Sequence, residues 1–167
     1  MKADHKLYKK QGIYDFPQKN KGKSMLMYAV GALLSSRVRD LDLSFFNTED
    51  DIPSEIKHLK YLETLSLYGN VNTMLKSINI CPEISTLNHL KALRIAAMGV
   101  VSLPANFAEL GDTLESLDLN SNNFSRIPDV ITAENFPKLT SLNLASNRRA
   151  SVTDLRNASN VGIDRKS

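Results

Sequence analysis

The chain has 167 residues and a formal charge of +3, from 21 Lys and Arg against 18 Asp and Glu. This length suits one domain, and the longest apolar run, Met25 to Leu34, has ten residues, too few for a membrane-spanning helix, which needs about 20. The single Cys81 excludes an internal disulfide framework and lacks the companion ligands of a zinc site.

The positive charge lies at the two ends of the chain. Residues 1–37 hold eight basic and two acidic residues, residues 38–147 hold eight basic and fourteen acidic, and residues 148–167 hold five basic and two acidic. We therefore predict a basic N-terminal arm over residues 1–23, in which seven lysines are interleaved with aromatic residues. Such an arm is a candidate for attachment to nucleic acid or to an anionic membrane.

Residues 24–37 predict a helix that caps the N-terminal end of the following segment. Ser24 is a favourable N-cap residue, and Leu26, Val30 and Leu33 lie on one face of the predicted helix. The same stretch starts too far from Met1 for a signal peptide and offers no small-x-small cleavage site.

A Leu-x-Leu core recurs five times between residues 38 and 150. The cores begin at Leu41, Leu65, Leu93, Leu117 and Leu142, at intervals of 24, 28, 24 and 25 residues. An Asn follows the first leucine by five positions in three copies, and an apolar–Pro step comes later at Ile52-Pro53, Cys81-Pro82, Leu103-Pro104 and Ile127-Pro128. The alternation places both leucines on one face of a short strand. Because one strand cannot bury that face alone, we predict stacked copies that share a core.

This pattern resembles the leucine-rich repeat family, and residues 98–107 and 122–131 match its consensus closely. The resemblance implies an α/β solenoid: a right-handed horseshoe of about five repeats with a short parallel sheet on its concave face. It also implies a non-enzymatic module that binds a protein or peptide partner on that face. Irregular repeats without disulfide caps favour a bacterial surface or secreted protein, so we expect an extracellular or cell-surface location.

Two segments depart from the repeat. Residues 71–80 are an insertion on the convex side, in which Met74, Leu75, Ile78 and Ile80 predict an extra helical turn packed on the return segment, with a specialised binding loop as the alternative. Residues 151–167 read as a polar tail or an incomplete last repeat. An uncapped terminal repeat exposes a strand edge, so we expect that the protein continues, that the chain is a fragment, or that a partner covers this end.

The candidate partner-binding residues flank the leucines, at positions predicted to face the concave side. Most of these positions hold small or polar residues, and the exceptions are Asp40, Asp42, Phe45, Tyr68, Arg94 and Asp118. Since aromatic and Arg side chains dominate interface energetics, we predict a partner site centred on Phe45, Tyr68 and Arg94. The alternative is a solvated face that carries an Asp–Arg–Asp ladder. Arg94 is the only base in the set, which favours a basic or mixed protein partner over nucleic acid.

No catalytic, metal or cofactor site is predicted. The histidines at 5, 58 and 89 lack metal-ligand spacing, and the acidic run ending at Asp51 lacks the turn Gly of a calcium loop. Gly22-Lys23-Ser24 lacks the earlier glycine of a phosphate-binding loop. Asn123-Phe-Ser125 fits the N-glycosylation pattern, which arises often by chance. Besides a partner-binding module, the sequence leaves open a specificity or targeting domain of a larger protein.

Overall fold

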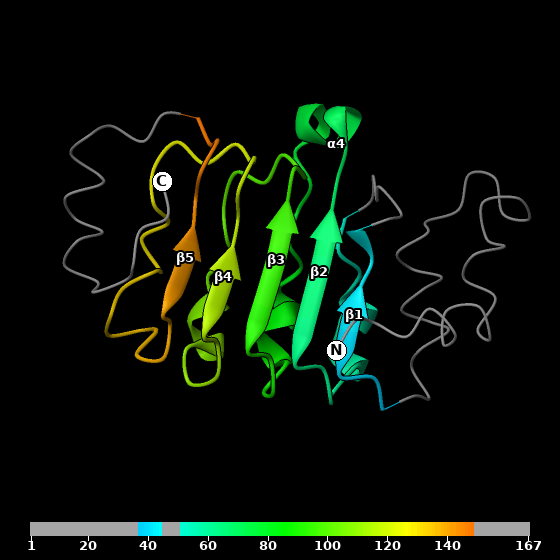
Figure 1. Cartoon of the computed structure of the whole chain (residues 1–167), viewed down its shortest axis with the longest axis vertical. Coiled ribbons are helices and arrows are strands. Elements are labelled where there is room, and N and C mark those ends of the chain that lie inside the picture. The colour runs from blue at the N-terminus through cyan, green and yellow to red at the C-terminus, as the bar shows by residue number, and fades with distance from the viewer. Residues whose placement is uncertain (1–36, 45–50, 149–167) are drawn as a thin grey trace, which may run out of the picture.

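The computed structural model describes residues 37–44 and 51–148, and within them five short strands form one parallel sheet in chain order (Figure 1). The predicted arm 1–23, the predicted cap apart from Arg37, and the tail 151–167 lie outside the described residues. The strands are β1 (Asp40–Asp42), β2 (Thr64–Tyr68), β3 (Ala92–Ala96), β4 (Ser116–Asp118) and β5 (Ser141–Asn143).

The strand register confirms the predicted alignment of the five Leu-x-Leu cores. Leu41 pairs with Leu65, Leu65 with Leu93, Leu93 with Leu117, and Leu117 with Leu142. Because neighbouring strands in a sheet lie about 4.8 Å apart, each core leucine meets its counterparts in the adjacent repeats. The strands thus turn one-dimensional sequence periodicity into rows of equivalent side chains.

Short return segments lie behind the sheet and bring the chain back to start the next strand. Three of them contain 3-10 helices that stack on one another: η3 (Ser54–His58), η4 (Pro82–Thr86) and η5 (Phe107–Leu110). Each return begins with a tight turn, in which a backbone N–H bonds the carbonyl three residues earlier, as from Ile56 to Pro53 at 3.1 Å and from Phe107 to Pro104 at 3.0 Å.

The predicted apolar–Pro step at Cys81-Pro82 is displaced by one residue. The Ile84 N–H bonds the Cys81 carbonyl at 3.2 Å, so Cys81 occupies the place that Pro53 and Pro104 hold in other repeats. Pro82 instead begins η4, where its missing N–H costs no helical bond. The turn therefore depends on an extended residue at this position, and proline is one way to provide it.

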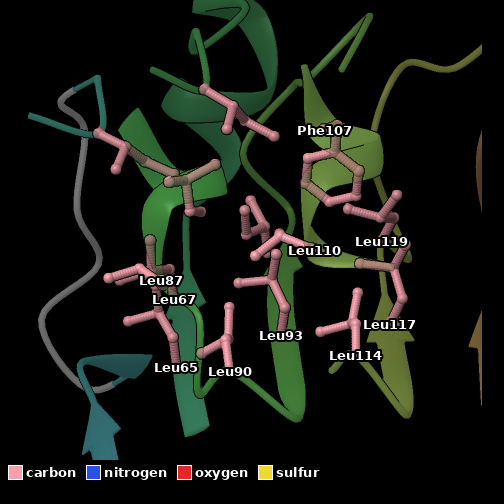
Figure 2. Close-up of a cluster of buried hydrophobic side chains, with 14 of the residues drawn as sticks. Leu65, Leu67, Leu87, Leu90, Leu93, Phe107, Leu110, Leu114, Leu117 and Leu119 are labelled. Carbon is pink, nitrogen blue, oxygen red and sulfur yellow. The ribbon is translucent and has the colours of Figure 1, made fainter. Parts of the chain in front are cut away.

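The core is one continuous cluster of buried side chains between the sheet and the return segments (Figure 2). The leucines of neighbouring strands, among them Leu65, Leu93 and Leu117, point to the same side of the sheet and are at most 1% exposed. Phe107 and Phe136 extend the cluster towards the C-terminal repeats, with ring centroids 5.9 Å apart. Burial of each such side chain contributes about 1.5–3 kcal/mol of hydrophobic stabilisation.

Two asparagines tie the ends of neighbouring strands together. The Asn122 side chain is 2% exposed, and its Oδ1 accepts the backbone N–H groups of Met98 and Val100, each at 3.1 Å. Its Nδ2 donates to the carbonyls of Ile95 at 2.7 Å and Leu119 at 3.0 Å. One repeat later, Asn147 Nδ2 bonds the Leu119 carbonyl in the same way. These amides satisfy backbone groups that neither helix nor sheet can pair.

The insertion forms helix α4 (Val71–Lys76), which lies beyond the ends of β2 and β3 in Figure 1. Ile78 and Ile80 are buried, but Leu75 is 82% exposed, so the prediction that Leu75 packs inward is wrong. Asn123 holds the helix in place, because its Nδ2 donates to the Met74 carbonyl at 2.9 Å and the Gly99 carbonyl at 3.3 Å. The amide nitrogen of the glycosylation pattern is therefore engaged in the folded chain.

Truncation of a core leucine tests the shared core. Leu117 is fully buried in β4, so we expect Leu117→Ala to lower the free energy of unfolding by about 2–5 kcal/mol. Urea denaturation followed by circular dichroism measures this loss. Ser116→Ala, on the other face of the same strand, is the control and should change stability by less than about 0.5 kcal/mol. Equal midpoints for the two variants would contradict the assignment of the core face.

Gly111 marks a close approach between two consecutive return segments. A Cβ atom at this position would lie 1.7 Å from the Asn135 carbonyl oxygen and 3.0 Å from that of Ala108. Both obstacles are backbone atoms, so no rotamer change relieves the clash.

We expect Gly111→Ala to destabilise the fold by about 1–3 kcal/mol, since the backbone around Asn135 must move to admit the methyl group. Thermal unfolding beside Asp112→Ala, an exposed neighbour, measures the effect. If Gly111→Ala unfolds at the wild-type temperature, the two segments do not pack this closely.

Candidate functional site

The strands present a second face, opposite the core, that we call the polar sheet face. Its side chains are those that alternate with the buried leucines, and neighbouring strands place them in rows. One row runs through Asp40, Thr64, Ala92, Ser116 and Ser141, and the next through Asp42, Ser66, Arg94, Asp118 and Asn143. Five of the six candidate residues lie on this face; the placement of Phe45 lies outside the described residues, so its role stays a prediction.

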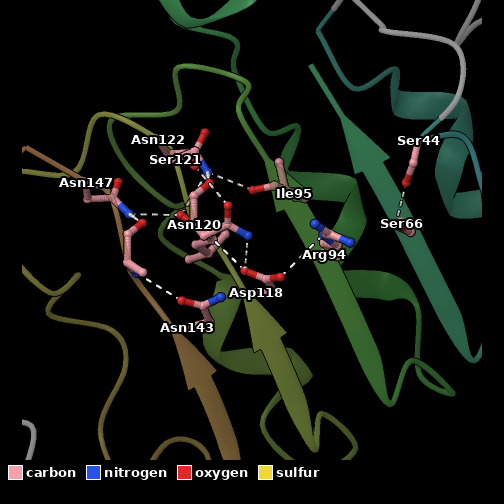
Figure 3. A network of polar contacts seen from close by, with 12 residues as sticks. Ser44, Ser66, Arg94, Ile95, Asp118, Asn120, Ser121, Asn122, Asn143 and Asn147 are labelled. Atoms are coloured by element: carbon pink, nitrogen blue, oxygen red, sulfur yellow. Dashed lines mark hydrogen bonds and ion pairs between the residues drawn. The ribbon is translucent and has the colours of Figure 1, made fainter. Parts of the chain in front are cut away.

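Three of the candidate residues form one chain of contacts across β2, β3 and β4. Arg94 Nε lies 3.3 Å from Asp118 Oδ2, as the dashed line between them in Figure 3 shows. On its other side, the Arg94 guanidinium carbon lies 5.7 Å from the centroid of the Tyr68 ring, within the range of a cation–π interaction. The structure thus brings together Tyr68, Arg94 and Asp118, which we call the Arg94 cluster.

The Arg94 cluster is accessible from solvent. The side chain of Arg94 is 46% exposed and that of Asp118 is 25% exposed, while Tyr68 is 36% exposed. Ala92 and Ser116 lie beside Arg94 on the same face, and such small side chains leave the guanidinium standing above its surroundings. A group that approaches the sheet therefore meets a cation whose position is already fixed on two sides.

The other two candidates lie on β1, away from this cluster. Asp42 is two strands from Arg94, with Ser66 between them. Asp40 Oδ1 accepts a hydrogen bond from Thr64 Oγ1 at 2.6 Å. The candidate site is therefore a cluster on β2 to β4 with two carboxylates at the β1 side.

Two of the candidate carboxylates also have a structural role that the sequence analysis missed. Asp42 Oδ1 accepts the Ser44 N–H at 2.9 Å, and Asp118 Oδ1 accepts the Asn120 N–H at 3.1 Å. Asn143 does the same for the Ala145 N–H at 3.0 Å (Figure 3). Asp and Asn form such turns readily, and their recurrence in one row of the repeat is the signal that could have revealed them.

Other chemistries find no support among the described residues. Within residues 37–44 and 51–148, no three His, Cys, Asp or Glu side chains gather closely enough to hold a metal ion. None of the helices in those ranges has the length and hydrophobicity that a bilayer span requires.

Comparison with known proteins agrees with this geometry. A family model described as leucine-rich repeats, in two copies, matches residues 112–157, and these residues include β4 and β5, whose leucines pair in register. The chain has a leucine-rich repeat solenoid fold. None of the curated proteins matches it in sequence.

Several solved structures resemble this solenoid. Internalin C2 from Listeria monocytogenes is 25% identical with a TM-score of 0.58, over 86% of this chain and 54% of the internalin. A leucine-rich repeat protein of Leptospira interrogans is 26% identical with a TM-score of 0.46, over 70% of this chain and 34% of its own. A plant ice-binding protein is 27% identical with a TM-score of 0.46, over 66% and 33%. The chain thus spans about half the length of internalin C2.

Substitution of Asp118 separates its structural role from its charge. We expect Asp118→Asn to keep stability within about 0.5 kcal/mol, because an amide oxygen can bond the Asn120 N–H as Asn143 bonds the Ala145 N–H, and an exposed ion pair contributes little. Asp118→Ala loses the ion pair, the bond from the Asn120 N–H and the bond from Asn120 Nδ2 at 2.6 Å, and should cost about 1 kcal/mol. Urea midpoints of the two variants measure the difference, and a loss for Asp118→Asn as large as that for Asp118→Ala would show that the ion pair with Arg94 dominates.

Proposed function

We propose that the chain is a non-enzymatic module that binds a protein or peptide partner on the polar sheet face, centred on the Arg94 cluster. Leucine-rich repeat proteins generally mediate protein–protein interaction. The observation that carries the proposal here is the contact of Arg94 with Tyr68 and Asp118 on an exposed sheet face. Side chains of the Tyr and Arg types supply most of the binding energy in measured interfaces.

Preorganisation makes the cluster suited to binding. Ordering a long side chain at an interface costs about 0.5–1.5 kcal/mol, and Arg94 is already held by Asp118 through Nε and by the Tyr68 ring. The described residues provide no hydrogen bond to its two terminal NH₂ groups. These donors are the part of Arg94 that a partner carboxylate or backbone carbonyl would meet.

The charge around Arg94 favours a partner of mixed sign. Asp118 flanks Arg94 directly, and Asp40 and Asp42 add negative charge two strands away. A partner that carries an acceptor for Arg94 between basic groups would complement this pattern, and complementary charge raises the rate and specificity of association. Phe45 precedes the gap in the described residues and belongs to the same proposal as an apolar contact at the β1 side.

We also propose that this module is part of a longer protein. Because the solenoid spans 54% of internalin C2, the chain can serve as the specificity or targeting domain of a longer protein. The likeness to a Listeria protein supports the bacterial part of the proposed surface or secreted type. Under this alternative the polar sheet face still binds the partner, while another part of the longer protein carries the activity.

Removal of the two anchoring side chains tests the site. We expect Tyr68→Ala combined with Arg94→Ala to weaken binding of the partner by at least about 2 kcal/mol, or about 30-fold. The immobilised wild-type chain first retrieves the partner from host or cell-envelope extract, and calorimetry with the purified partner then gives each dissociation constant.

Ser116→Ala combined with Ser141→Ala is the matched control, since both serines lie on the same face outside the cluster. The control should bind like the wild type, and both double variants should keep the wild-type unfolding midpoint. Unchanged affinity of the Tyr68/Arg94 variant for that partner would refute the proposed site.

A further inference from the structure

Exposed cations gather at the edge of the sheet where the chain enters the first three strands. We call this edge the amino rim; in Figure 1 it runs along the lower side, because the strand arrows point upward. Its cations come from the segments just before β1, β2 and β3 and from the end of η3. They are Arg37, Arg39, Lys57, Lys60 and Lys91, all of them exposed.

Contacts between side chains link the segments before β1, β2 and β3. The Arg37 guanidinium carbon lies 5.4 Å from the centroid of the Tyr61 ring. Glu63 forms an ion pair with Arg39 on one side and with Lys91 Nζ at 3.0 Å on the other. The Glu63 carbonyl also accepts the Lys91 N–H at 2.8 Å, so the register of the sheet fixes the spacing of this row.

The patch keeps a net positive charge. Along the row at the strand entrances, Arg39 and Lys91 alternate with Glu63 and Glu115, whose N–H bonds the Lys91 carbonyl at 2.8 Å, so the excess positive charge comes from Arg37, Lys57 and Lys60. Hydrogen bonds from Lys91 and Arg39 hold the pKa of the Glu63 carboxyl below its usual value, so its charge is already matched within the row. Lys57 and Lys60, by contrast, form no ion pair with a described residue, and their ammonium groups are exposed.

Towards its C-terminal end the amino rim is of mixed charge, with the exposed Lys138 before β5. Before β4 the same edge carries Asp112 and Glu115, both exposed, and these carboxylates would repel an anion. At the other end the chain continues into residues 1–36, which hold seven lysines and two aspartates. The basic turns and the basic N-terminal sequence are thus joined at Arg37.

The arrangement favours a planar anionic surface over a nucleic acid. The cations lie at the ends of parallel repeats, about 4.8 Å apart from strand to strand, so one flat surface can meet several turns at once. Tyr61 is 47% exposed among them, and Tyr is enriched where protein meets the membrane interface. Arg37 covers one face of its ring, which removes that face as a platform for base stacking.

We propose that the N-terminal part of the amino rim docks on the headgroups of anionic lipids, through Arg37, Lys57, Lys60 and Lys91. This surface is separate from the polar sheet face, so the inference does not depend on the proposed partner. It also extends to the repeats a membrane contact that the sequence analysis assigned only to residues outside them. Each cation held near an anionic bilayer strengthens binding by about fivefold, so four give an interaction that salt screens readily.

Charge reversal on the full-length chain tests the rim. Lys57→Glu with Lys60→Glu removes two exposed cations, and Lys138→Glu with Arg148→Glu makes the same change in net charge at the other end of the described chain. Binding is measured by cosedimentation with vesicles of phosphatidylcholine and phosphatidylglycerol in equal parts, at low and at physiological salt. Phosphatidylcholine vesicles and a duplex DNA oligonucleotide are the comparison ligands.

We expect the Lys57/Lys60 variant to bind the anionic vesicles at least about 25-fold more weakly than the wild type, because two cations are lost. The Lys138/Arg148 variant should lose no more than about fivefold, and neutral vesicles should bind none of the proteins. Both variants should keep the wild-type circular dichroism spectrum, since all four side chains are exposed. Any one of three results overturns the proposal: equal losses for the two variants, wild-type binding by the Lys57/Lys60 variant, or tighter binding to the DNA than to the vesicles.

Discussion

No strand of this solenoid can bury its own leucines, and the structure depends on the in-register contact of each repeat with the next. Leu41, Leu65, Leu93, Leu117 and Leu142 form one row because their strands pair residue for residue. The amide of Asn122 locks the same register at the strand ends, where it bonds backbone groups of two adjacent repeats. Stability and side-chain placement therefore have a common origin in the interface between repeats.

The same register produces two surfaces of different character. Along the middle of the strands it places Arg94 between Tyr68 and Asp118, where a cation is held by aromatic and acidic neighbours. At the strand entrances it places Glu63 between Arg39 and Lys91, where one acid is held by two cations. Because both sets point away from the core, their composition can change while the leucines stay constant. A repeat scaffold can thus carry separate contacts for separate ligands.

Much of the fold could be predicted from the sequence, since alternation and spacing determine which residues of a parallel sheet align. The sequence could not predict the local contacts of single residues. Cys81 takes the place of proline in a turn, so a search for proline locates this turn one residue too late, at Pro82. Leu75 looked like a core residue, but the short helix α4 stands on the strand ends and exposes it. Asp118 was predicted as a partner contact or a member of an Asp–Arg–Asp ladder, and its bond to the Asn120 N–H was not predicted.

Charge at the amino rim was missed for a different reason: residues 38–147 are acidic in sum, and only the folded sheet places Arg39 and Lys91 on either side of Glu63. A sum over a segment hides such clusters.

The replacement of proline by Cys81 gives the protein an internal chemical reporter. Its thiol donates to the Pro53 carbonyl at 3.4 Å, and burial raises its pKa, so the reactive thiolate is scarce while the second and first repeats remain packed together. It is also the one thiol in the chain. Because Cys81 is only partly buried, its alkylation is slowed but not blocked in the folded chain, and loss of the contact with Pro53 should speed it.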